Sequence, residues 1–420
     1  MLRRNAAIIL CTLACGFAVT AMAGSTEIPT FGSENRQVLQ FLEERVRQDP
    51  DDFVAQNRLG NIYLDRLRET GGYEWLQKAR AAARRSLGSV EAAQNADGLA
   101  LLARVEHESH QFAAARDAAL ELTKIEPRKS RAFTSLGDAL LELGDVADAA
   151  KAYEQARERG AHLFEVETRE ARVKMARGAF AEARQHFEAA LAAAADISPS
   201  QPQFAIWCHL QLGQLAFRIG EWERAEKHYA AALKLHADDA HALEHLAELR
   251  GAQEKYEEAI ALYDKVIDRL PRPEFWQARG DLAAAAGKPP EAASWYARAR
   301  EGYLRDVEAG NAHYYHHLAG FFSDAEPNPA EAVKWARRDL ELRRSAGAHD
   351  ALAWALFRAG EFVPAAEAAR AALGSGTKDA QILFHAGMIF LAAGDAAAGK
   401  EMLAEAARIN PRHTSFHVHR

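Results

Sequence analysis

Small and bulky side chains recur along this chain at fixed positions of a frame of about 34 residues. The frame is clearest in residues 240–273, where positions 7, 8, 20, 24 and 32 are occupied by Leu246, Ala247, Ala259, Tyr263 and Pro271. A small residue lets two antiparallel helices cross closely, and an aromatic or branched side chain fills the space beside it. Proline at position 32 ends the second helix. Because no stretch alternates apolar and polar residues convincingly, the pattern predicts helix pairs and no sheet.

The frame recurs ten times, often with glycine at position 15 to end the first helix. The ten units begin at Phe53, Ala96, Ser130, Phe164, Ile206, Ala240, Pro273, Ala312, Ala346 and Ala380. Five of the nine intervals between these starts have the length of the frame. In this period and framework the chain resembles the tetratricopeptide-repeat family over about residues 36–411. The resemblance implies an all-α, right-handed superhelical solenoid of about ten helix pairs, which binds a partner protein or extended peptide on its concave face without catalysis.

Departures from the period mark irregular places in the array. The first unit, 53–95, is longer than the frame, and we expect residues 68–72 to lengthen the turn between its helices. The fourth, 164–205, is longer because of a Pro- and Ser-containing stretch at 195–203, which predicts a loop and a flexible point. The seventh, 273–311, is longer through an extended second helix across 300–310. The expected divisions are a signal peptide at 1–23, a disordered linker at 24–35, an array with a capping helix at 36–195, a loop at 196–203, a second array at 204–411 and a tail at 412–420.

The N-terminal segment has the pattern of a secretory signal. Arg3 and Arg4 precede a mostly apolar stretch, which ends in small residues at Ala21 and Ala23. The pattern predicts cleavage after Ala23 and an exported protein, periplasmic or extracellular, with no stable membrane span after cleavage. A lipoprotein attached through Cys15 is the weaker alternative, because Thr12 stands where a lipobox favours leucine.

Charge and cysteine content narrow the classes of partner. The net charge is −7, from 52 basic and 59 acidic residues. Such a surface, with no local basic stripe, disfavours a nucleic-acid partner. Of the three cysteines, Cys11 and Cys15 leave with the signal, so Cys208 has no disulfide partner and is expected to be a packing residue. Residues 394–401 approach a phosphate-binding loop but end in Glu401, which would repel phosphate, and no cofactor is expected.

Histidines and carboxylates are expected on the concave, first-helix face of units six to eight. Residues 241–245 have the H-x-x-E-H spacing of inverted zinc peptidases, which places two imidazoles on one helix face. The candidate metal ligands are His241, His245, His313, His316 and His317. The candidate acidic contacts for a partner are Glu244, Glu248 and Asp281, and Glu274 and Asp324 occupy equivalent first-helix positions. We favour a solvated concave face, and the alternatives are a site for a basic peptide and a metal-binding or metal-dependent hydrolytic site.

Units nine and ten place apolar residues at concave positions that are polar in most solenoids. These candidate partner-binding residues are Trp354, Phe357, Phe384, Met388 and Leu391. Exposed aromatic and Met side chains are what peptide anchors dock into. The alternatives are that they belong to the core, or that the tail covers them with Phe416. Because the tail is too short to cap the last unit, the exposed end should bind its own tail, a second copy as a dimer, or a partner.

Overall fold

The computed structural model describes residues 33–197 and 202–415, which contain 21 α-helices and no strand. The predicted all-α fold of stacked helix pairs is confirmed. A single helix, α1 (Ser33–Gln48), precedes ten pairs. The pairs are α2 (Phe53–Thr70) with α3 (Tyr73–Ser89), α4 (Ala96–Glu108) with α5 (Phe112–Ile125), α6 (Ser130–Glu142) with α7 (Val146–Glu158), α8 (Leu163–Ala176) with α9 (Phe180–Ile197), α10 (Gln203–Arg218) with α11 (Trp222–Leu235), α12 (Ala240–Ala252) with α13 (Tyr256–Arg269), α14 (Pro273–Ala285) with α15 (Pro289–Glu308), α16 (Tyr314–Gly320) with α17 (Pro329–Leu342), α18 (Ala346–Arg358) with α19 (Phe362–Gly374), and α20 (Ala380–Ala392) with α21 (Ala396–Ile409).

Glycine at position 8 lets the two helices of a pair touch, as the frame predicts. A Cβ at Gly137 would overlap the ring of Tyr153, which projects from the second helix of the same unit. The same overlap would arise between Gly213 and Tyr229, and a Cβ at Gly280 would lie 2.6 Å from a ring carbon of Tyr296. The three glycines therefore occupy equivalent helix crossings, because only a residue without a side chain leaves room for the ring.

Two of the expected irregularities differ from the structure. The extra residues of the first unit lengthen α2, which continues to Thr70, so the turn before α3 consists only of Gly71 and Gly72. The backbone of Gly71 has a φ of 70°, which ends the helix in the left-handed conformation. Of the loop expected at 196–203, the first two residues belong to α9, which runs to Ile197, and Gln203 begins α10, while residues 198–201 lie outside the described residues. The longer second helix of unit seven is confirmed, since α15 extends from Pro289 to Glu308.

The apolar core continues from unit four into unit five. The rings of Phe187 on α9 and Trp207 on α10 lie 6.0 Å apart and at a steep angle, within one buried cluster. Cys208 is buried in the same cluster, as expected of a packing residue, and burial raises the pKa of its thiol. At the N-terminal end, Leu42 of α1 belongs to the cluster formed by the first unit. The predicted signal at 1–23 and most of the linker at 24–35 lie outside the described residues.

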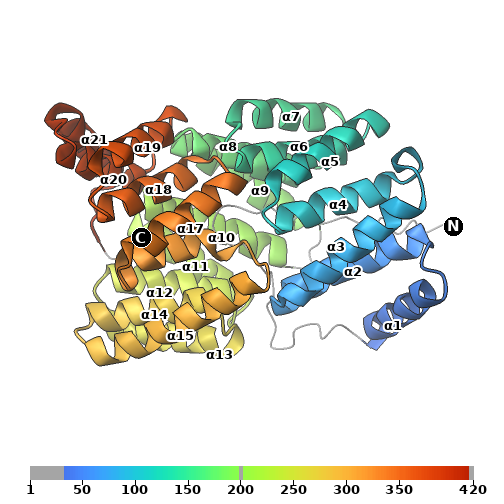
Figure 1. Ribbon diagram of the computed structural model, residues 1–420, viewed down its shortest axis with the longest axis horizontal. Coiled ribbons are helices and arrows are strands. Elements are labelled where there is room, and N and C mark those ends of the chain that lie inside the picture. Colours follow the sequence, from blue (N-terminus) through green and yellow to red (C-terminus); the bar gives the residue numbers. More distant parts are fainter. Residues whose placement is uncertain (1–32, 198–201, 416–420) are drawn as a thin grey trace.

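The array winds back on itself, so that the later units lie against the earlier ones (Figure 1). The turn inside each of the first four units meets the turn leading into the unit six places further on. The turn inside unit five meets the segment that follows α21. We call this line of contacts the seam; its pairs are Gly71 with Arg272, His110 with His313, Gly144 with Arg344, Gly178 with Lys378, and Gly220 with Asn410.

Hydrogen bonds and an ion pair reinforce the seam. The hydroxyl of Tyr73 donates to the carbonyl oxygen of Gly310 at 2.6 Å, and the Arg218 guanidinium lies 2.7 Å from the Asp379 carboxylate. The seam therefore closes one turn of the superhelix onto the next and encloses the first-helix faces of both. None of the helices in the described part of the chain is both long and apolar enough to span a membrane.

Candidate functional site

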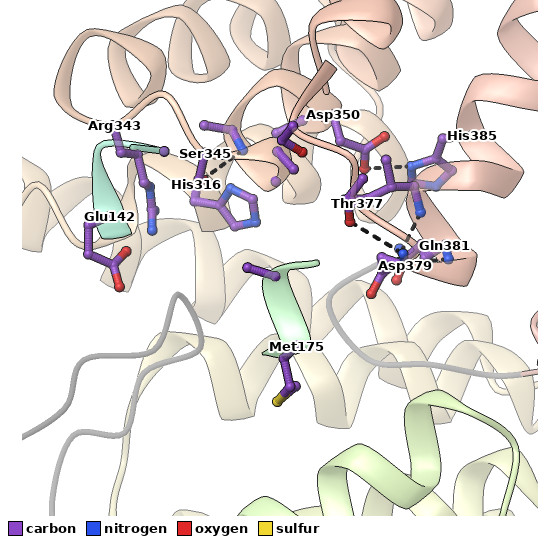
Figure 2. Close-up of a pocket in the computed structure, with 18 of the residues that line it drawn as sticks. Glu142, Met175, His316, Arg343, Ser345, Asp350, Thr377, Asp379, Gln381 and His385 are labelled. Atoms are coloured by element: carbon purple, nitrogen blue, oxygen red, sulfur yellow. Dashed lines mark hydrogen bonds and ion pairs between the residues drawn. The ribbon is translucent and has the colours of Figure 1, made fainter. Parts of the chain in front are cut away.

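A cavity of about 300 Å³ lies inside the seam, between units three to five and units seven to ten. Figure 2 shows Glu142 and Met175 on the earlier units, together with His316, Arg343 and a group of polar side chains on the later ones. We call this space the inner cavity. Its walls are mainly first helices and the turns that precede them, so it lies on the concave face that the repeat frame predicts for a ligand.

An aromatic and acidic group forms the wall contributed by units nine and ten. The imidazole of His385 lies 2.9 Å from the Asp350 carboxylate (Figure 2). It also stacks on the indole of Trp354, with ring centroids 4.1 Å apart. Burial disfavours the charged imidazole, but the Asp350 carboxylate outweighs burial and raises the pKa of His385. This ring therefore keeps its proton to a higher pH than an ordinary histidine, and Trp354 presents its face to it.

The arginines that line the inner cavity are paired with carboxylates. Arg172 donates to Glu142 at 2.9 Å, and Arg343 donates to Asp339 at 2.8 Å. Asp339 also lies 3.3 Å from His316. Because the opposite charges lie side by side, the cavity carries no strong net charge and favours a ligand with both apolar and polar groups over a simple anion.

Of the predicted aromatic cluster of units nine and ten, Trp354 lines the inner cavity, whereas Phe357 packs against the core and against Phe362 of the second helix. The members of the cluster are half-buried, except Leu391, which is 37% exposed; they are Trp354, Phe357, Phe384, Met388 and Leu391. The rings of Trp354 and Phe357 stack at 5.0 Å, and the Trp354 indole donates to Asp324 at 2.8 Å. The tail reaches part of the cluster, because the ring of His413 lies 5.4 Å from that of Phe384. Phe416, which the sequence suggested as the cover, lies outside the described residues.

The predicted acidic residues lie in and beside a second cavity, of about 420 Å³. Asp281, Asp324 and Glu254 line it, and Asp281 accepts a hydrogen bond from the Tyr296 hydroxyl at 2.8 Å. We call this space the acidic cavity. It adjoins the inner cavity, because Gln277 and Gly320 line both. Glu244 and Glu248 lie on α12, the first helix of unit six, and each lies within 4 Å of a histidine of its own helix. They do not line the acidic cavity, to which unit six contributes Glu254 from the turn after α12.

Most of the histidines proposed as metal ligands contact other kinds of side chain, although the rings of His313 and His317 also contact each other, with centroids 5.2 Å apart. His241 and His245 lie beside Glu244 and Glu248, at 3.5 and 3.8 Å. His313 contacts His110 across the seam, His316 contacts Asp339, and His317 stacks on Tyr303 with ring centroids 5.9 Å apart. Within residues 33–197 and 202–415, no three His, Cys, Asp or Glu side chains are grouped to hold a metal ion. The metal-binding and hydrolytic alternatives therefore gain no support from this geometry.

Two residues of the site, His385 and His110, were not predicted. Asp324 was expected on the concave face of unit eight, and it lies there on a π-helical turn (η2, Phe321–Ala325) that directly follows α16; such turns often occur at functional sites. His385 was not singled out because its partner Asp350 is on another unit. His110 could have been found, since it occupies position 15, where most units have glycine. It has a φ of 58°, a conformation that costs energy for any residue with a Cβ.

A sequence model of the tetratricopeptide-repeat family matches residues 100–162, 210–271 and 246–303. The matched segments coincide with helix pairs that have the close glycine crossings described above. This chain contains tetratricopeptide repeats. Proteins of this kind are generally scaffolds for protein interactions. A comparison with curated proteins found no match.

Solved structures of similar fold include repeat proteins from several sources. Yeast Tom70 is 12% identical, with a TM-score of 0.38, covering 85% of this chain and 92% of that one. A human IFIT1 dimer with PPP-AAAA is 13% identical, with a TM-score of 0.46 and coverage of 89% and 86%. PilW, described as a type IV pilus biogenesis factor, is 18% identical, with a TM-score of 0.42 and coverage of 50% and 94%. At these identities the likeness concerns the fold alone.

Proposed function

We propose that this repeat protein is an exported, non-catalytic scaffold that binds an extended segment of a partner protein along its concave face. The observation that carries the proposal is the pair of adjoining cavities on that face, of about 300 and 420 Å³. Together they follow the first helices of units six to ten. An extended peptide fits such a path better than a small molecule, because its successive side chains can enter successive cavities.

The chemistry of the two cavities suggests what the segment carries. The acidic cavity presents the carboxylates of Asp281 and Asp324, which favour a lysine or arginine. The inner cavity presents the half-buried indole of Trp354, which favours an apolar or aromatic anchor. A partner segment with a basic residue and an aromatic or aliphatic residue a few positions apart would therefore satisfy both cavities.

Export is the part of the proposal that rests on the sequence alone. If the N-terminal segment is removed after Ala23, protein recovered from the producing cells begins at Gly24, and N-terminal sequencing of that protein checks this. A start at Met1, or a lipid on Cys15, would contradict it.

A photo-crosslinking residue placed in the concave face tests the proposed binding. Gln381 lines the inner cavity, so p-benzoylphenylalanine at this position should form a discrete adduct with a partner protein when cells producing the variant are irradiated. The matched control is the same residue at Val363, which is 68% exposed on the second helix of unit nine. Adducts of equal yield at both positions, or none at Gln381, would contradict binding on the concave face.

A further inference from the structure

The chain turns back across the seam after its last helix. Asn410 and Pro411 pack against Gly220, in the turn inside unit five. The guanidinium of Arg412 then donates to the carbonyl oxygen of Gly220 at 2.8 Å and lies 4.3 Å from the ring centroid of Trp222. A cation held over an indole and bonded to a backbone carbonyl is a specific anchor. The tail is thus attached to the body of the protein where it could have extended into solvent.

The residues after Arg412 enter the concave face. The ring of His413 packs on Phe384, and Thr414 and Ser415 line the acidic cavity together with Asp281 and Asp324. The acidic cavity is formed by units six, seven and eight, which are far from unit ten in the sequence. The tail therefore occupies part of the path that we propose for a partner peptide.

The charge of the tail complements the cavity it enters. Residues 412–420 contain two arginines and three histidines but no acidic side chain. The described wall around Thr414 and Ser415 contributes three carboxylates, from Glu254, Asp281 and Asp324. The tail also carries one aromatic residue, Phe416, four positions after its anchoring arginine. It therefore has the composition that the two cavities favour in a ligand.

We infer that the tail that begins at Arg412 is a resident ligand of the concave face through its residues up to Ser415, and that a partner segment of similar basic and aromatic character must displace it in order to bind. This inference rests on the proposed function and adds the control of that same site. A tethered segment competes at an effective concentration in the millimolar range, so an external peptide binds the complete chain much more weakly than a chain without the tail.

The test uses a fluorescein-labelled peptide of residues 410–420 as the probe and fluorescence anisotropy as the readout. We expect the peptide to bind a chain that ends at Pro411 at least about tenfold more tightly than the full chain. The full-length variant Arg412→Ala, which removes the anchor over Trp222 and keeps the rest of the tail, should show an intermediate affinity. This second variant keeps the comparison decisive if the truncated chain folds poorly. Equal affinities for the full-length, truncated and Arg412→Ala chains would overturn the inference.

Two matched substitutions in the truncated chain locate the peptide. Asp281→Asn removes a carboxylate of the acidic cavity and keeps an acceptor for Tyr296, and it should weaken peptide binding by about threefold. Glu257→Gln removes a carboxylate that is 74% exposed on the second helix of unit six, and it should leave the affinity unchanged. Equal losses in the two variants, or equally tight binding of a peptide with the same residues in scrambled order, would mean general charge attraction and would overturn the inference.

The outcomes separate this inference from the proposed function. If the tail peptide does not bind while adducts still form at Gln381 in cells, the concave face binds partners without control by the tail. If the peptide binds the truncated chain but no adduct forms at Gln381, the tail is a ligand of the concave face and the proposed partner binding there fails.

Discussion

Replacing Asp138 with alanine should lower the free energy of unfolding by about 3–5 kcal/mol. Asp138 lies between units three and four, buried beneath two arginines. It accepts hydrogen bonds from Arg169 at 2.8 and 3.1 Å and from the hydroxyl of Tyr153 at 2.9 Å. Arg172 lies 3.5 Å away, and the Arg169 side chain is only 1% exposed. Without the carboxylate, the buried Arg169 guanidinium would lose this counter-charge beside the guanidinium of Arg172, which keeps Glu142 as a partner carboxylate.

The ionisation of Asp138 agrees with this role. Burial opposes its charge, yet Arg169 and Arg172 outweigh burial and hold the pKa of the carboxyl below its usual range. It is therefore ionised throughout the neutral range, and its charge stabilises the folded state at any pH above the ordinary pKa of an aspartate.

Urea unfolding followed by circular dichroism measures the loss. The control is Asp148→Ala on the neighbouring helix α7, where the carboxylate is 61% exposed and pairs with Lys151 at 2.7 Å. An exposed pair of this kind contributes at most about 1 kcal/mol. Hydrogen exchange should place the lost protection of Asp138→Ala in α6 and α8. A change no larger than that of Asp148→Ala would show that the buried arginines find solvent or other partners.

The sequence predicted the parts of the fold that arise from contacts within a unit. Gly137 and Tyr153 belong to the two helices of one unit, so the demand for a small residue opposite a ring recurs from unit to unit and is visible as a period. The seam joins residues of units that are far apart in the sequence, such as Gly144 and Arg344, and no periodic pattern records that pairing. It follows from the curvature of the whole array, which is the sum of small rotations between units.

For the candidate site, too, the sequence predicted only those features that arise within one unit. The frame placed Trp354 and Asp281 on the concave face, because that face is a property of one unit. It could not supply their surroundings, which come from other units: Asp324 accepts from Trp354, and the tail reaches the acidic cavity beside Asp281. The frame also placed His313 on the concave face as a metal ligand, whereas the structure places it on the seam against His110.

Acidification should weaken the seam through this histidine pair. The Nδ1 atom of His313 lies 3.2 Å from Nε2 of His110, and the ring centroids are 5.0 Å apart. Burial, reinforced by nearby positive charge, lowers the pKa of His313 to about 3 and that of His110 well below its usual value. The groups that face the pair are His107 on α4, Arg272 before α14, His316 on α16, and Asp339 and Arg343 at the end of α17. Of these only Asp339 favours a proton on the pair.

The sign of the effect follows from where the protons bind. The unfolded chain takes up a proton on each histidine near pH 6.5, while the folded chain does not. Each of the two histidines therefore lowers the free energy of unfolding by up to about 1.4 kcal/mol for every pH unit below 6.5, until its folded-state pKa is reached. His245 and His385 act in the opposite direction, because nearby carboxylates raise their pKa values despite burial. The contribution of the pair must therefore be isolated by a variant.

The variant His110→Gly isolates the contribution of the histidine pair, because glycine removes the imidazole and adopts the positive φ of this turn without strain. The matched control is Glu254→Gly. Glu254, with a φ of 61°, is the other non-glycine residue with a positive φ in the described part of the chain; it lies in the equivalent turn of unit six, and its replacement relieves backbone strain without removing a histidine. Both variants should be as stable as the parent, or more so, at pH 7.5. Between pH 7.5 and pH 5, thermal unfolding should show that only His110→Gly loses less stability than the parent, since the repulsion that acid creates at the seam is absent from it. Parallel losses in the parent and in both variants would mean that the seam does not respond to acid through His110.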